Sequence, residues 1–105
     1  HVCDVAAGHS LAYERLDDAA GHRAYNLGAG EGVSVRQLLD VASAVVGREL
    51  PHAVVDRAPG DVPALVGDIG AIAEARGWRP TATLEEICAD AWRFTRAHAD
   101  GYGAA

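Results

Sequence analysis

Two capping boxes determine where two helices of this chain begin. In Ser34–Gln37 and Thr83–Glu86, a hydroxyl residue and a side chain three positions later can each accept from the other's backbone N–H. Apolar residues then recur at helical spacing. The first stripe contains Val35, Leu38, Leu39, Ala42, Val45 and Val46, and the second contains Leu84, Ile87, Cys88, Ala91, Trp92 and Thr95. The sequence predicts one helix that stops at Gly47 and another that runs to about His98.

Two further helices are indicated by single cap residues. Asp4 can serve as the N-cap of a helix that continues to about Asp17, since a carboxylate is favourable at the positive end of a helix. Asp68 can cap a shorter helix that is stopped by Gly77. Trp78 follows as a large side chain that we expect to be buried.

Two short segments have the composition of β-strands. Arg23–Leu27 is followed by glycines, and Pro51–Asp56 contains two adjacent valines. The order of elements predicts an α/β fold with about four helices and two short strands, in one domain spanning residues 1–105. Because two strands alone are marginally stable, we expect both to join a sheet or an apolar face supplied by sequence outside these residues.

The charge balance argues against nucleic acid as a partner. Nine Lys and Arg residues stand against 15 Asp and Glu, and the formal net charge of −6 repels a phosphate backbone. No apolar run is long enough to indicate a membrane span, and no charged segment followed by an apolar one opens these residues, so we expect neither membrane insertion nor export. Cys3 and Cys88 lack metal-site or redox spacing, which indicates reduced thiols in a cytoplasmic protein. The chain begins with His1 rather than methionine, which indicates either missing upstream sequence or the removal of a tag or processing site.

No complete catalytic or metal site can be assembled from these residues. The chain contains no lysine, so its tyrosines cannot form a tyrosine–lysine base pair, and it has no G-x-S-x-G motif. His1, Cys3, Asp4 and His9 match no usual metal-ligand spacing. Gly28–Gly32 lacks the G-x-G-x-x-G spacing of dinucleotide sites, and we interpret it as a turn. We expect no catalytic, cofactor-binding or metal-binding residue in this chain.

The loop Arg57–Pro63 is the polar segment of greatest interest. Its prolines and its glycine are incompatible with a central strand, and loops of this kind often carry function. Arg57 can bind a phosphate through two hydrogen bonds, and Asp61 can accept from ribose hydroxyls. A surface turn with an ordinary salt bridge has the same composition. Composition and spacing leave both interpretations open.

Several motifs, in order along the chain, resemble the C-terminal third of the UDP-glucose 4-epimerases, which belong to the extended short-chain dehydrogenase/reductase group. His1–His9 is similar to the family's "HV-DLA-GH", and Tyr25–Val35 is similar to "YNLG-G-G-SV". Pro59–Ala64 resembles the "R-GD-A" loop. The segment from Leu84 to Tyr102 resembles the closing "L-E-I--DAWRW---HP-GY". The resemblance covers essentially the whole chain.

The resemblance implies a fold and a reaction for the intact protein. An N-terminal Rossmann domain would bind NAD and hold the catalytic residues, and the present chain would be a small C-terminal portion that binds the UDP-sugar. The reaction would interconvert UDP-glucose and UDP-galactose through an NAD-dependent 4-keto intermediate. The chain alone would be inactive. Its partners would be the UDP-sugar, its own Rossmann domain and, when intact, a second copy.

The resemblance also implies roles for four residues. Val35 would contact the nucleotide, Asp61 would accept from ribose hydroxyls, and Leu65 would lie beside the sugar and leave room for N-acetylated sugars. The family's phosphate-binding arginine is usually found where this chain has Ala58. Arg57, one position earlier, would take over that contact if the loop shifts.

Two other functions are compatible with the residues. Another extended reductase that acts on nucleotide sugars, such as a dehydratase, would share this C-terminal architecture. A non-catalytic module that binds another chain through apolar helix faces would also lack lysine and catalytic groups. An acid pair beside the catalytic tyrosine upstream would indicate the dehydratase, and a start codon next to His1 would favour the module.

Overall fold

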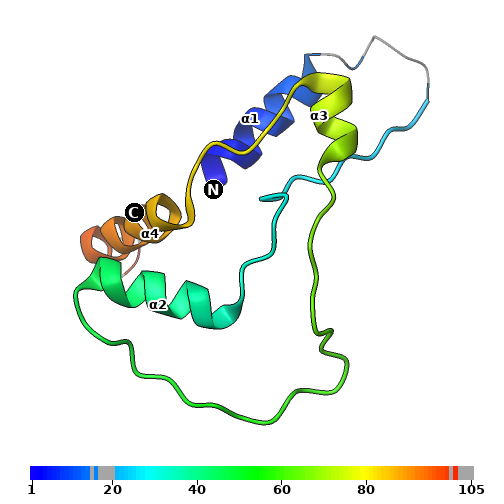
Figure 1. Ribbon diagram of the computed structural model, residues 1–105. Helices are drawn as coiled ribbons and strands as arrows, with labels where there is room; N and C mark the ends of the chain where they lie inside the picture. Colours follow the sequence, from blue (N-terminus) through cyan, green and yellow to red (C-terminus); the bar gives the residue numbers. More distant parts are fainter. Residues whose placement is uncertain (15, 17–20, 100, 102–105) are drawn as a thin grey trace. The chain divides into compact units, whose positions relative to one another are not determined.

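The computed structural model describes residues 1–14, 16, 21–99 and 101, and it contains four helices (Figure 1). They are α1 (Val2–Tyr13), α2 (Val35–Val46), α3 (Gly70–Arg76) and α4 (Leu84–Ala97). The chain divides into two compact units. Unit 1 consists of His1–Gly32 and Gly60–Thr81, and unit 2 consists of Val33–Pro59 and Ala82–Ala105.

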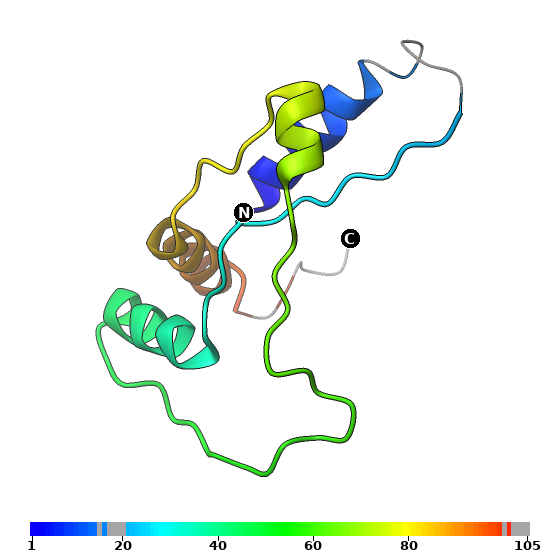
Figure 2. The same cartoon turned by 45° about the vertical axis from the view of Figure 1, so that its right-hand side comes forward.

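Unit 2 is a pair of capped helices, α2 and α4, that lie side by side (Figures 1 and 2). Both predicted capping boxes are confirmed. Ser34 Oγ accepts from Gln37 N at 3.1 Å, and Gln37 Oε1 accepts from Ser34 N at 2.9 Å. The corresponding distances for Thr83 and Glu86 are 3.2 and 2.7 Å. The predicted stop of α2 at Gly47 is also confirmed, because this glycine adopts a left-handed conformation with φ of 78°.

Unit 1 is held together around Asp4 and Trp78. The Trp78 indole Nε1 donates to the Asp4 carbonyl at 3.0 Å, and the indole is buried as predicted. The Asp4 carboxylate accepts from both the backbone N and the hydroxyl of Thr81, at 3.1 and 2.7 Å. Ile72 of α3 is 1% exposed. Polar contacts to one buried carboxylate therefore connect the start of α1 to the segment that follows α3.

The prediction that Asp4 is an N-cap was wrong. His1 occupies that position, and its Nδ1 accepts from Cys3 N at 3.0 Å. Asp4 lies in the first turn of α1, and its carboxylate accepts hydrogen bonds from Thr81 instead of from the backbone at the helix end. The structure places the end of α1 at Tyr13, and the predicted end near residue 17 lies outside the described residues.

The start of α3 also differs slightly from the prediction. Ile69 occupies the cap position and makes no side-chain cap bond, while Asp68 Oδ1 accepts from Gly70 N at 2.7 Å. The carboxylate thus supplies the acceptor one residue before the cap position. The predicted stop at Gly77 is confirmed, with φ of 69°.

The two predicted strands are not found, because the described part of the chain contains no β-strand. Residues 23–27 belong to unit 1 and residues 51–56 to unit 2. Neither segment has a strand ladder, and a segment without a hydrogen-bonded neighbour is not a strand. Val54 and Val55 are 85% and 80% exposed. The helices of the predicted α/β fold are therefore present, and residues 1–14, 16, 21–99 and 101 form no sheet.

Replacing Asp4 by alanine should destabilise unit 1 by about 1–3 kcal/mol, because two Thr81 donors would lose the buried, charged carboxylate that accepts from both of them. Urea unfolding followed by fluorescence in a Trp92→Phe background measures this, since Trp78 is then the reporter in unit 1. Asp40→Ala on the exposed surface of α2 is the matched control. Equal shifts for the two variants would contradict the assignment.

Replacing Thr83 by alanine should cost about 1 kcal/mol, because α4 would lose the acceptor for Glu86 N. Thr83→Ser retains the hydroxyl and should lose little stability. Thermal unfolding monitored by circular dichroism compares the two variants, and a Thr83→Ser variant as unstable as Thr83→Ala would exclude capping as the cause.

Candidate functional site

The segment from residue 57 to residue 63 is an irregular, exposed loop, as the sequence predicts. A turn forms at Pro59 and Gly60, and Gly60 has φ of 93°, a left-handed value that favours glycine. The boundary between the two units falls at this turn. The loop is thus a connection in which side chains remain accessible to a ligand.

The four predicted site residues are all exposed, and they are divided between the units. Val35 is the first residue of α2 in unit 2 and is 83% exposed, and Arg57 lies in the same unit. Asp61 and Leu65 lie in unit 1, with Leu65 89% exposed. Neither unit contains the complete set. Arg57 makes no hydrogen bond or ion pair with another described residue, so its guanidinium is available to an anion.

The glycine run 28–32 packs closely against the segment before α3. Gly30 has φ of 78°, and a Cβ there would lie 2.9 Å from Ile69 Cδ1. A Cβ on Gly32 would lie 3.1 Å from Val66 Cγ2. The neighbouring Asn26 Nδ2 donates to the Asp68 carbonyl at 3.2 Å. These glycines therefore permit close packing inside unit 1, a role that the sequence did not indicate.

Three of the residues considered as metal ligands make hydrogen bonds within the chain instead. His1 caps α1, Asp4 accepts from Thr81, and the His9 Nδ1 donates to the Val5 carbonyl at 2.8 Å. Across the described ranges, no group of three or more His, Cys, Asp or Glu side chains is arranged to hold a metal ion. Cys3 and Cys88 are both free cysteines in the structure. No helix in the described ranges has the length and apolar character to cross a membrane.

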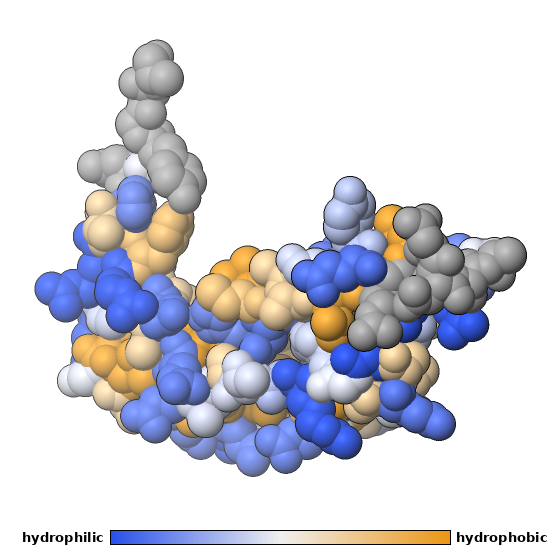
Figure 3. Space-filling view, turned by 90° about the horizontal axis from the view of Figure 1, so that it is seen from above, coloured by the Kyte–Doolittle hydropathy of each residue, from blue (hydrophilic) through white to orange (hydrophobic). Residues whose placement is uncertain are grey.

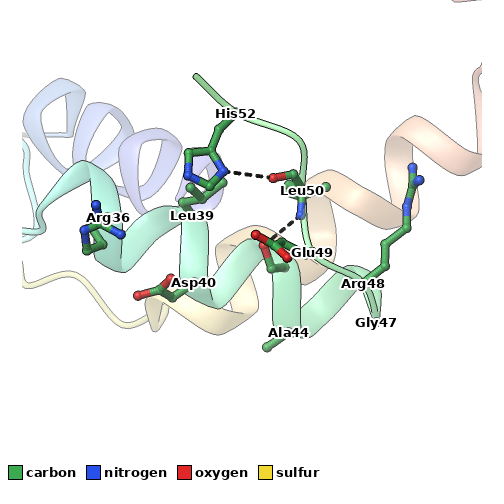
Figure 4. Close-up of a pocket in the computed structure, with 10 residues that line it drawn as sticks. Arg36, Leu39, Asp40, Ala44, Gly47, Arg48, Glu49, Leu50 and His52 are labelled. Carbon is green, nitrogen blue, oxygen red and sulfur yellow. Dashed lines mark hydrogen bonds between the residues drawn. The ribbon is translucent and has the colours of Figure 1, made fainter. Parts of the chain in front are cut away.

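Sequence reasoning missed a shallow cavity on unit 2 (Figure 4). Its volume is about 480 Å³, and it is formed by α2 and the residues that follow it. Ser43 Oγ accepts from Leu50 N at 3.2 Å, and His52 Nδ1 donates to the Leu50 carbonyl at 3.1 Å. None of the four predicted site residues lines it. The lining residues are Arg36, Leu39, Asp40, Ser43, Ala44, Gly47, Arg48, Glu49, Leu50 and His52.

The whole chain is similar in sequence to one group of known enzymes. No family model matches. The chain is 39% identical to the UDP-glucose 4-epimerase of Bacillus subtilis over 105 residues, which is 100% of this chain and 31% of that enzyme. It is 37% identical to the human UDP-glucose 4-epimerase over 103 residues, which is 98% of this chain and 30% of that enzyme.

The chain matches the C-terminal part of UDP-glucose 4-epimerases. A crystal structure of UDP-glucose 4-epimerase from Bifidobacterium longum in complex with NAD+ and UDP agrees, with a TM-score of 0.90 and 29% identity. That match covers 97% of this chain and 30% of the crystallised chain. The resemblance found in the sequence is therefore confirmed. The chain spans about 30% of the length of the curated epimerases it matches.

Gly30→Ala and Gly47→Ala together test the packing role of the glycine run. Both glycines have φ of 78°, so each variant should lose about 1 kcal/mol from the left-handed backbone. Only Gly30→Ala adds a clash, because nothing lies within 4 Å of a Cβ at Gly47. Chemical denaturation should show the larger loss for Gly30→Ala.

Adding Ile69→Val should recover part of the loss in the Gly30→Ala variant, because valine lacks the Cδ1 atom. A double-mutant cycle isolates this coupling from the cost of Ile69→Val alone. A coupling of zero would mean that Ile69 does not restrict residue 30.

Proposed function

We propose that residues 1–105 are the C-terminal UDP-sugar-binding domain of an NAD-dependent UDP-glucose 4-epimerase. The observation that carries the proposal is the match of the entire chain to these enzymes, at 39% identity with the Bacillus subtilis relative. The similar crystal structure contains NAD+ and UDP. In this proposal the protein is cytoplasmic and acts as a homodimer, and the present residues alone are inactive.

The proposed task of this chain is to hold the nucleotide while the sugar turns. An epimerase must present both faces of the sugar to one reaction centre, so binding energy is best concentrated on UDP. Asp61 would accept from ribose hydroxyls, Arg57 would bind phosphate, and Val35 would contact the nucleotide. The exposure of all three residues supports their accessibility.

We assign no NAD-binding residue to this chain. Gly30 and Gly32 pack against the side chains of Ile69 and Val66, and the glycine run lacks the spacing of a dinucleotide site. The absence of lysine from the sequence removes one member of the expected catalytic set. In the proposed enzyme, NAD is held by an N-terminal Rossmann domain. The comparisons name epimerases, and we favour neither the dehydratase nor the interaction module.

UDP titration by calorimetry tests the site. The protein to use is a fusion in which this chain replaces the matching C-terminal part of the Bacillus subtilis enzyme. Asp61→Asn should weaken UDP binding about tenfold, because an amide accepts more weakly than a carboxylate. Asp40→Asn, on the exposed surface of α2, should bind UDP as the parent does. A fusion that folds without any affinity for UDP would refute the proposal.

Leu65 is proposed to permit N-acetylated sugars, because a leucine leaves more space beside the sugar than a tyrosine. Leu65→Tyr in the same fusion should abolish turnover of UDP-N-acetylglucosamine and retain turnover of UDP-glucose. Leu65→Met is the volume-conserving control. If the parent fusion turns over UDP-glucose and not UDP-N-acetylglucosamine, this specificity assignment fails.

A further inference from the structure

The segment from residue 64 to residue 68 leads from the loop of residues 57–63 toward α3, and it contains Leu65. The segment is irregular, so no helix or strand hydrogen bonds hold it in place. Apolar side chains are visible at the surface of the molecule among polar ones (Figure 3), and Leu65, at 89% exposure, is one of the most exposed. The position of Leu65 within unit 1 therefore depends on how the residues next to it are held.

Two contacts with residues 26–32 restrain this segment, which they pass just before α3 (Figures 1 and 2). The Asn26 Nδ2 donates to the Asp68 carbonyl at 3.2 Å. Val66 Cγ2 lies 3.1 Å from the position that a Cβ on Gly32 would occupy. All four residues belong to unit 1. The hydrogen bond restrains the end next to α3, and the second contact restrains the residue directly after Leu65.

Gly32 is needed at this contact for its missing side chain and not for its backbone conformation. Gly30 and Gly60 have positive φ and Gly32 does not, so the backbone of Gly32 accepts alanine. Carbon atoms pack at about 3.5–4.0 Å, so a Cβ at 3.1 Å would require Val66 to move by a few tenths of an ångström. Rotation about χ1 is restricted in a β-branched side chain. We therefore expect the backbone at Val66 to shift.

A shift of Val66 is transmitted to Leu65, because adjacent Cα atoms keep a fixed separation of about 3.8 Å. Val66 contacts the glycine run on one side. The other side of the segment is open, since residues 64–68 are all exposed. A Cβ on Gly32 therefore displaces the segment toward the open side, into which the exposed Leu65 extends.

We propose that Gly32 is a positioning residue for sugar selectivity, because its missing side chain sets how far Leu65 reaches into the space beside the sugar. The proposal rests on the proposed function, in which Leu65 lies next to the sugar. The substrates that it separates are UDP-sugars with a hydroxyl group and UDP-sugars with a bulkier N-acetyl group. A displaced Leu65 would obstruct the N-acetyl group and leave room for the hydroxyl, since packed contacts tolerate little added volume.

The ratio of kcat/KM for UDP-N-acetylglucosamine to kcat/KM for UDP-glucose measures this effect in the Bacillus subtilis fusion. Gly32→Ala should lower the ratio about fivefold. Gly67→Ala is the matched control, because it adds a methyl group directly after Val66 where nothing lies within 4 Å and φ is not positive. Its ratio should equal that of the parent. A loss of stability alone lowers both rates equally, so equal losses from Gly32→Ala would overturn the proposal.

Val66→Ala provides the rescue, because alanine lacks the Cγ2 atom that the new Cβ would meet. The Gly32→Ala/Val66→Ala variant should have a ratio within about twofold of Val66→Ala alone. The double variant also carries the test if Gly32→Ala alone does not fold. A ratio that stays about fivefold below that of Val66→Ala would overturn the contact with Val66 as the cause.

The outcomes separate this proposal from the proposed function. If the parent fusion turns over both substrates and Gly32→Ala leaves the ratio unchanged, the role of Gly32 alone is overturned. A parent that turns over UDP-glucose and not UDP-N-acetylglucosamine would have the same meaning. A folded parent without affinity for UDP would overturn both proposals. If the fusion does not fold, the same assays use the 105-residue chain co-expressed with the remaining part of the Bacillus subtilis enzyme.

Discussion

Unit 1 depends on the hydrogen bonds that the buried Asp4 carboxylate accepts from Thr81. Asp4 and Thr81 are separated by 77 positions in the sequence, and Asp4 and Trp78 by 74, yet both contacts are direct hydrogen bonds. A carboxylate with 7% exposure would be unfavourable without donors, and Thr81 supplies two of them. Gly8, one turn later on α1, allows Leu27 and Trp78 to approach the helix. The hydrogen bonds of Asp4 to Thr81 and Trp78 and the missing side chain of Gly8 therefore hold α1 within unit 1.

Local sequence patterns predicted the helices well. Each capping box satisfies its donors within four residues, so no distant part of the chain can change the outcome. The wrong cap at Asp4 has the opposite cause, because a distant partner, Thr81, uses the carboxylate that the local pattern assigned to the helix end. The strands failed for a related reason. Their hydrogen bonds require a neighbouring strand, and none of the described residues forms one.

The candidate site was predictable in composition but not in arrangement. The sequence indicated an accessible loop with an arginine and a carboxylate, and the structure shows both residues exposed. It did not indicate that Arg57 and Asp61 belong to different compact units. The glycine run shows the same limit, since its packing partners Val66 and Ile69 lie more than 30 residues away in the sequence. Distances of this kind depend on tertiary contacts that a single sequence does not specify.

The interleaving of the two units has a consequence for the integrity of the chain. The polypeptide passes between them after Gly32, after Pro59 and after Thr81. A single proteolytic nick in the exposed turn at Pro59 and Gly60 would give two fragments, each containing one segment of unit 1 and one segment of unit 2. Both units would then persist only as non-covalent assemblies. The backbone at this turn thus acts as a covalent tether for two folding units at once.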